Sequence, residues 1–270
     1  MDIHLANITK TYPLAERPAL QLDELCLHGG KVHGILGESG SGKSTLLNLL
    51  ALLDRPDDNR NSVLRFHPKG IDNPGHGWGG KAEDHAGHAL IPHNGDDEWR
   101  RKYYSFVFQS GYLQENFTVR DNVLMPLRLQ GALTPETIAR AEQRLDTVGI
   151  ERDKWGDLPR QLSGGQYQRV AVARALSHEP HVVFADEPTG SLDTGRGKEV
   201  MEALIAWKNE RPGSNLLVLV THDANNVKKY CDHVSVLRDG RVIMQGSKDA
   251  LDFAEIQKAM SGESRPPAEA

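Results

Sequence analysis

A group of glycines, hydroxyls and one lysine lies near the start of the sequence, with a spacing that suits phosphate binding. Glycines permit backbone angles that turn several N–H groups toward one point, which makes a nest for phosphate oxygens. The residues concerned are Gly37, Ser39, Gly40, Ser41, Gly42, Lys43, Ser44 and Thr45. This is the spacing of a P-loop, in which Lys43 reaches the β- and γ-phosphates and Ser44 ligates Mg²⁺. The alternative is a chance glycine turn.

Two adjacent carboxylates follow a later apolar run. Asp186 and Glu187 come directly after residues 182–185, which read Val-Val-Phe-Ala. An apolar strand that ends in carboxylates delivers them to the carboxyl edge of a sheet, where α/β proteins bind ligands. We expect Asp186 to hold the Mg²⁺ shell and Glu187 to orient or deprotonate the attacking water. Without the P-loop, a solvated strand end would be the simpler interpretation.

A third polar segment, residues 162–166, reads Leu-Ser-Gly-Gly-Gln and precedes a predicted helix. A serine and two glycines at a helix start present N–H groups to an anion, and the helix dipole favours negative charge there. The candidate anion-binding residues are Ser163, Gly164, Gly165 and Gln166. Taken alone, a Ser-Gly-Gly helix start is common.

The elements that must position these residues alternate between strand and helix. Residues 32–36, 182–185 and 216–220 are continuous apolar runs, which are typical of parallel strands buried on both faces. An apolar helix through residues 46–53 is expected after the P-loop. The sequence therefore predicts a mixed α/β protein with a parallel central sheet.

Local signals predict two further elements. Thr134 and Pro135 mark the start of a helix that Gly149 ends. Asp239 and Gly240 stand between two apolar runs, which is a strong signal for a β-hairpin. We therefore expect some antiparallel strands beside the parallel sheet.

The P-loop and residues 162–166 together resemble the ATP-binding cassette (ABC) family over roughly residues 1–250. The resemblance implies a RecA-like P-loop NTPase core, an antiparallel β subdomain, and a helical subdomain at about residues 110–178 that carries the signature. It also implies ATP and Mg²⁺ as cofactors. In the family, Ser163 and its glycines face the γ-phosphate of ATP held by a second copy, so that a complete site needs two chains.

Further single residues resemble family elements. Tyr12 is similar to the aromatic that stacks on adenine, and an ordinary tyrosine is the alternative. Gln109 is similar to the glutamine that touches Mg²⁺ and the attacking water, and His222 to the switch histidine on the γ-phosphate. Asp193, after Ser191 and Leu192, is similar to the loop that communicates across the dimer.

Composition limits the classes of protein that fit. The chain has 270 residues and a formal net charge of -5, so a global nucleic-acid footprint is not indicated and no nucleic-acid partner is expected. We expect neither a signal peptide nor a membrane span, because apolar runs are short. Cys26 and Cys231 are far apart and are expected to be buried free thiols.

One segment departs from the family pattern. Residues 56–98 are rich in glycine and histidine and are expected to form an atypical, solvated loop. Its histidines match no standard zinc spacing, although imidazoles are good metal ligands. Residues 251–270 are expected to form a C-terminal helix and a disordered tail.

The motif surroundings most resemble the subgroup of lipoprotein-releasing, macrolide-exporting and cell-division ATPases. This resemblance implies a peripheral subunit on the cytoplasmic face of the cell membrane. ATP hydrolysis would drive integral membrane permease subunits by transport or by mechanotransmission. A soluble ABC ATPase acting on DNA or ribosomes is the alternative. It is disfavoured because the chain has no sustained heptads and a single cassette.

Overall fold

The computed structural model describes residues 1–57, 62–67, 76–78, 96–190, 192 and 194–261. Its larger sheet has six strands in the order β10-β9-β3-β8-β7-β6. The five strands from β9 to β6 run parallel, and β10 is antiparallel to β9. The bounds are β3 Val32–Leu36, β6 Tyr104–Phe108, β7 Val182–Asp186, β8 Leu216–Thr221, β9 His233–Arg238 and β10 Arg241–Ser247.

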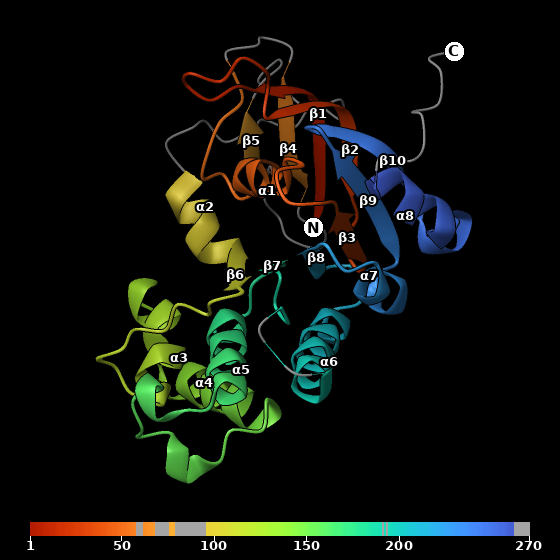
Figure 1. Cartoon of the computed structure of the whole chain (residues 1–270). Coiled ribbons are helices and arrows are strands. Elements are labelled where there is room, and N and C mark those ends of the chain that lie inside the picture. Colours follow the sequence, from red (N-terminus) through yellow and green to blue (C-terminus); the bar gives the residue numbers. More distant parts are fainter. Residues whose placement is uncertain (58–61, 68–75, 79–95, 191, 193, 262–270) are drawn as a thin grey trace.

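A second sheet is antiparallel, in the order β2-β1-β4-β5, and in Figure 1 it lies above β6, β7 and β8 of the larger sheet. Its strands are β1 Asp2–Lys10, β2 Leu20–Leu27, β4 Val63–His67 and β5 His76–Trp78. The predicted parallel core and antiparallel β part are both confirmed.

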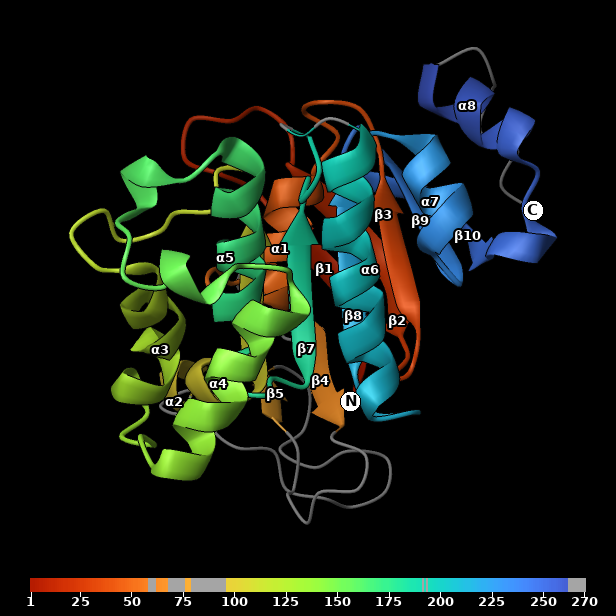
Figure 2. The same ribbon diagram turned by 90° about the horizontal axis from the view of Figure 1, so that it is seen from below.

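The part of the chain that the structure describes contains helices on both faces of the larger sheet. The helices are α1 Lys43–Leu50, α2 Asp96–Tyr103, α3 Val119–Leu129, α4 Pro135–Thr147, α5 Gly164–Leu176, α6 Thr194–Glu210, α7 Ala224–Tyr230 and α8 Phe253–Ser261. Figures 1 and 2 show α3, α4 and α5 packed together as one group, with α6 beside them against the sheet. None of these helices combines the length and apolar character that crossing a bilayer requires.

The parallel strands alternate between two hydrophobic cores. In β7, Phe184 packs with α1 and the antiparallel sheet, whereas Val183 and Ala185 pack with α5 and α6. Both sheet faces are therefore covered, which explains why these strands read as continuous apolar runs. The larger sheet is therefore packed between two hydrophobic cores.

The helices and the hairpin predicted from local signals are confirmed, with small differences in where they end. Thr134 caps α4 and Gly149 follows its end with a φ of +69°. Asp239 and Gly240 both have positive φ, as the hairpin turn between β9 and β10 requires. The helix after the P-loop ends at Leu50 rather than 53, and Leu53 is exposed.

Two expectations are wrong. Residues 56–98 are not one loop, because β4 pairs with β1 and β5 pairs with β4, and α2 begins at Asp96. Cys26 is exposed because Leu25 and Leu27 on either side of it point into the core, while Cys231 is buried as expected. His85, His88 and His93 lie outside the described residues, as does the predicted tail beyond residue 261.

Candidate nucleotide-binding site

The P-loop connects β3 to α1 at the carboxyl edge of the larger sheet. Gly40 and Gly42 have φ values of +81° and +102°, which side chains disfavour. A Cβ at Gly37 would lie 2.5 Å from the carbonyl oxygen of Leu237. The loop is also tied to the β9–β10 turn, because Gly240 N donates to Ser41 O at 3.0 Å. These glycines are required by the fold of the loop.

The Lys43 side chain folds back over the loop. Its Nζ donates to the carbonyls of Gly37 and Glu38, both at 2.7 Å. Burial lowers the pKa of Lys43, while the negative charges of Glu187 and Asp186 oppose that shift. The lysine therefore shares its surroundings with both predicted acidic residues.

The P-loop residues fit a phosphate ligand. The Oγ of Ser41 is buried and has no hydrogen-bond partner. Gly42, the N-cap of α1, supplies no side-chain cap, so the first N–H groups of the helix are not satisfied by a side chain. Buried polar groups usually have partners, and phosphate oxygens would supply acceptors here.

Asp186 and Glu187 lie at the end of β7, between the ends of β6 and β8. Asp186 pairs with Phe108 on one side and Val220 on the other. Burial raises the pKa of Asp186, as does the nearby Glu187, and Lys43 opposes both. Glu187 has a φ of +46°, a strained value of the kind often found at functional sites.

The structure brings Glu187 and His222 together. Oε1 of Glu187 accepts a hydrogen bond from the backbone N–H of His222 at 2.8 Å and lies 2.6 Å from its Nδ1. Thr221 Oγ1 donates to the other carboxylate oxygen at 3.2 Å. The parallel pairing of β7 with β8 makes this contact between residues 35 positions apart.

Gln109 follows β6 directly and lies against the loop after Glu187. A Cβ on Gly190 would lie 2.9 Å from the Nε2 of Gln109, so the amide of Gln109 lies directly against this glycine. Gly190 N donates to Glu187 O at 3.0 Å, which closes that loop. Gln109, Asp186, Glu187 and His222 thus belong to one edge of the sheet.

The signature residues form a capped helix start. Ser163 Oγ accepts from Gln166 N at 3.3 Å, and Ser163 N donates to Gln166 Oε1 at 2.9 Å. Ser163 and Gly164 are exposed, and no atom would meet a Cβ at Gly164 within 4 Å. The turn is therefore open to a ligand from outside.

Tyr12 and Asp193 complete the predicted set. Tyr12 is 37% exposed just beyond the end of β1, with Lys10 Nζ 5.2 Å from its ring centroid. Its partly exposed ring suits a stacking partner. Asp193 lies outside the described residues, and so does its neighbour Ser191.

Sequence reasoning missed the residues of α5 that fix the site. Gln168 is buried, and its Nε2 donates to Phe108 O at 2.9 Å and to Pro188 O at 3.1 Å. It thereby joins the loop of Gln109 to the loop after Glu187. Arg174 donates to the carbonyls of Gly111 and Tyr112 at 2.6 and 2.5 Å. The sequence feature that could have revealed Gln168 and Arg174 is a polar residue on the inward-facing side of a helix that is otherwise apolar there.

Comparison with known proteins decides the family. A family model for ABC transporters matches residues 20–190. The methionine import ATP-binding protein MetN 4 of Oceanobacillus iheyensis is 35% identical over 94% of this chain and 68% of its own length. The chain belongs to the ABC transporter family of ATP-binding proteins.

Two other relatives of this ABC protein differ in length. The uncharacterized ABC transporter ATP-binding protein YvcR of Bacillus subtilis is 35% identical, with 96% of this chain and 93% of YvcR covered. The pyoverdine export ATP-binding/permease protein PvdT of Pseudomonas fluorescens is 34% identical, but this chain spans 38% of it.

Solved ABC structures share the fold. The dimeric ABC transporter cassette MJ0796 matches with a TM-score of 0.73 and 34% identity, over 92% of this chain and 100% of that one. The same cassette is known as a dimer bound to ADP and Pi, in a post-hydrolysis state, and matches at 33% identity with a TM-score of 0.73. This chain is therefore an ATP-binding ABC subunit with ATPase activity.

Proposed function

We propose that this ABC subunit holds MgATP on its own P-loop and hydrolyses it only when a second copy closes the site. The convergence of Lys43, Asp186, Glu187 and His222 at one sheet edge carries the proposal. Hydrolysis would proceed by in-line attack of water on the γ-phosphorus, with charge spread over the phosphate oxygens.

Each group has a role that follows from its position. The P-loop amides and Lys43 would hold the phosphates, and Tyr12 would stack on adenine. Ser44 and Asp186 would ligate Mg²⁺, with Gln109 beside them. When bound, Mg²⁺ would neutralise charge on the β- and γ-phosphates.

Glu187 is the proposed water-orienting group. Its carboxylate is held by Thr221 and by two hydrogen-bonding groups of His222, so its orientation is set before substrate arrives. A carboxylate so fixed can accept a proton from water at the γ-phosphate. His222 contacts Oε1 of Glu187 and would stabilise charge on the transferred phosphoryl group.

The second copy would contribute its Ser163 turn. This turn is exposed and offers N–H groups of a helix start, which suits the γ-phosphate of the other chain's ATP. Asp193 would communicate across the same interface. The dimeric form of MJ0796 supports such a pairing.

The partner outside the dimer would be an integral membrane permease subunit, with this chain bound to it at the cytoplasmic face of the membrane. Six apolar residues between Gln109 and the signature are the candidates for docking it: Tyr112, Leu113, Phe117, Val119, Leu124 and Met125. Leu113, Val119 and Leu124 are buried in the helical group and are excluded, and Met125 is half-buried. Tyr112 and Phe117, at 63% and 43% exposed, are the most accessible of the six and are suited to partial burial by a partner.

We propose that the chain belongs to the subgroup of lipoprotein-releasing, macrolide-exporting and cell-division ATPases. PvdT, named as an export ATP-binding/permease protein, supports it, whereas MetN is named for import. Because the relatives include both an importer and an exporter, the proposal covers transport in either direction as well as mechanotransmission, and it includes no nucleic-acid partner.

The Glu187→Gln variant tests the catalytic assignment. Glutamine keeps the size of the side chain but accepts a proton poorly, so the rate of phosphate release should fall by about 10² to 10⁴. ATP binding should persist, and an ATP-dependent dimer should accumulate in size-exclusion chromatography. Glu202→Gln, on the exposed side of α6, is the matched control and should behave as wild type.

Lys43→Ala separates binding from chemistry in the same assays. It should lose nucleotide binding and dimerisation together, because the P-loop cation is gone. Near wild-type turnover in Glu187→Gln would remove this residue from catalysis. A monomeric, ATP-loaded Glu187→Gln protein, also in the presence of its permease, would count against the two-chain site.

Charge on the exposed aromatic pair tests the docking surface. Tyr112→Glu or Phe117→Glu should abolish stimulation of the ATPase by the permease and reduce co-purification, while basal turnover remains. Leu133→Glu, at an exposed leucine between α3 and α4, is the control. Unchanged co-purification and stimulation would refute the surface.

A further inference from the structure

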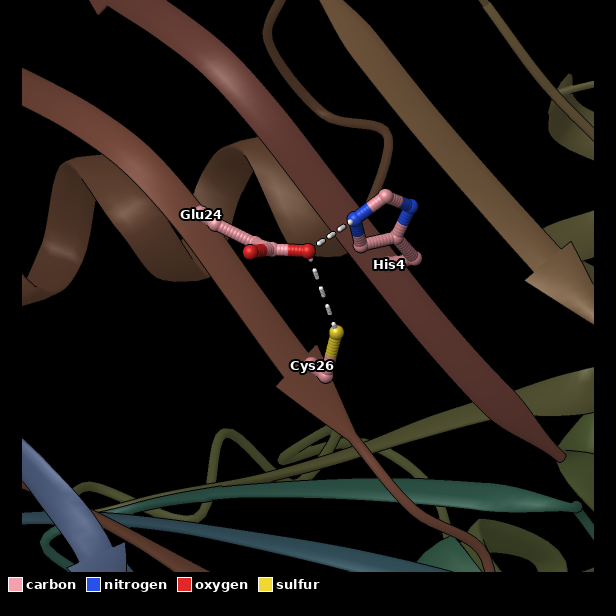
Figure 3. Close-up of side chains that lie close together, drawn as sticks. All are labelled: His4, Glu24 and Cys26. Atoms are coloured by element: carbon pink, nitrogen blue, oxygen red, sulfur yellow. Dashed lines mark hydrogen bonds and ion pairs between the residues drawn. The ribbon is translucent and has the colours of Figure 1, made fainter.

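Three metal-ligating side chains lie side by side on the outward face of the β1–β2 pair (Figure 3). In the strand register His4 is opposite Cys26, and Ala6 is opposite Glu24. Successive residues of a strand point to opposite faces of a sheet. His4, Glu24 and Cys26 therefore share one face, and the buried Leu25 lies on the other.

The three ligand atoms are close enough to meet one ion. His4 Nε2 lies 3.0 Å from Glu24 Oε1, and Cys26 Sγ lies 4.0 Å from the same oxygen. All three ligand atoms lie within 4.8 Å of one another. Zinc–ligand bonds of about 2.0–2.3 Å place neighbouring ligand atoms roughly 3.5 Å apart in a tetrahedron. Small side-chain rotations would bring the three ligand atoms from their present spacing to that of a tetrahedral site.

The backbone beneath these side chains is well supported. β1 is hydrogen-bonded to β2 on one side and to β4 on the other. Ile3 and Leu27, a facing pair, are buried beneath the sheet. Ala6, opposite Glu24, is small and leaves room for the carboxylate to lean toward His4. The ligand positions are thus set by a sheet rather than by a loop.

We propose that His4, Glu24 and Cys26 form a binding site for Zn²⁺ or a similar divalent transition cation. Thiolate, imidazole and carboxylate are the ligand set of Zn²⁺, whereas Mg²⁺ takes oxygen ligands. On binding, the Cys26 thiol releases its proton to solvent and the sulfur binds the cation. Three protein ligands leave one tetrahedral position for water.

A nucleophilic cysteine is the other use of such residues, and the geometry disfavours it. The hydrogen bond of the Cys26 thiol runs to the Glu24 carboxylate. An activated thiol needs a base positioned to take its proton, usually an imidazole. Here the imidazole of His4 is instead directed at Glu24. A cation bound by all three side chains fits this arrangement better than a nucleophilic thiol does.

The site is separate from the nucleotide site. His4 and Lys10 are six residues apart along β1, which is about 20 Å of extended strand, and Tyr12 lies beyond Lys10. Metal binding here is therefore independent of the proposed ATP chemistry. Binding of a cation by these three side chains does not depend on the roles of Lys43 and Glu187.

Titration of the untagged, nucleotide-free full chain with CoCl₂ tests the site. Thiolate coordination gives a charge-transfer absorption in the near ultraviolet, and we expect it to saturate at one equivalent. Cys26→Ser should abolish the band. Loss of even an outer-shell partner costs about 10- to 100-fold in affinity. His4→Ala and Glu24→Gln, which remove direct ligands, should therefore weaken Co²⁺ binding by at least about tenfold.

His28→Ala is the matched control. His28 is exposed, and it lines a cavity of about 230 Å³ together with Glu24, Cys26, His33 and His233. The variant should keep the band. Loss of the band in His28→Ala but not in His4→Ala would overturn the proposal, as would a band unaffected by both His4→Ala and Glu24→Gln.

Thiol labelling gives a second measurement that does not depend on cobalt. One equivalent of ZnCl₂ should protect Cys26 from alkylation by iodoacetamide, and a chelator should restore its reactivity. The buried Cys231 serves as an internal control that stays unreactive while the fold is intact. Full labelling of Cys26 in the presence of Zn²⁺ would overturn the proposal.

Discussion

At the scale of single residues, Gln168 shows how one amide can hold two catalytic loops. It is 2% exposed and bonds to the carbonyls of Phe108 and Pro188, which precede Gln109 and follow Glu187. Both of these bonds go to backbone carbonyls of the loops that carry the catalytic side chains, so it is a positioning residue. Its role follows from joining two strand ends that are distant in sequence.

Gln168→Leu should leave the buried carbonyl of Pro188 without that donor, which costs about 1–3 kcal/mol for an unsatisfied group, whereas the carbonyl of Phe108 keeps the N–H of Gly111. We expect kcat for ATP hydrolysis to fall while KM changes little, because the P-loop is untouched. Steady-state kinetics and urea unfolding measure the two effects. Gln143→Leu, on the exposed side of α4, should change neither. A raised KM with unchanged kcat would show that Gln168 serves binding instead.

At the scale of elements, the glycine- and histidine-rich segment divides into two parts. β4 and β5 belong to the antiparallel sheet, and Phe66 of β4 is fully buried. Residues 79–95 are outside the described part of the chain. Any shortening of the segment must therefore keep residues 76–78.

Deletion of residues 80–90 should leave basal ATP hydrolysis largely unchanged. Loop closure costs only about 0.6 kcal/mol per doubling of length, and the phosphate-contacting motifs lie elsewhere. Phe66→Ala, by contrast, should lower the free energy of unfolding by about 3–5 kcal/mol. A phosphate-release assay and thermal unfolding compare the two variants. Loss of nucleotide binding in a folded deletion variant would place the segment in the site.

At the scale of the whole molecule, a buried histidine should make the fold sensitive to acid. Burial lowers the pKa of His33 to about 3, helped by His233 and His28, while Asp232 opposes the shift. Its Nε2 accepts the backbone N–H of His28 at 2.8 Å, which requires the neutral ring. The unfolded chain binds this proton near pH 6.5, and the folded chain does not.

Stability should therefore fall as pH decreases from about 6.5 toward about 3, by up to roughly 1.4 kcal/mol per pH unit from this residue. His33→Gln keeps an acceptor but cannot be protonated, so its stability should depend less on pH. Urea unfolding at pH 7 and pH 5 measures the slope. Equal slopes in wild type and His33→Gln would contradict the assignment.

The sequence by itself determined the motifs and the type of fold. The P-loop, the strand ending at Asp186 and the capped start at Ser163 each depend on neighbours within a few residues. Local rules of glycine conformation, strand burial and helix capping therefore suffice to find them. The same rules located the Asp239–Gly240 turn and both ends of α4.

Only the tertiary structure decided which distant side chains meet. The contact of Glu187 with His222, the clamp of Gln168, and the meeting of His4 with Glu24 and Cys26 all depend on strand register or helix packing. A shift of one residue in register would turn every side chain of a strand to the opposite face. Register is fixed by the burial of whole strands against the core, which no short motif encodes.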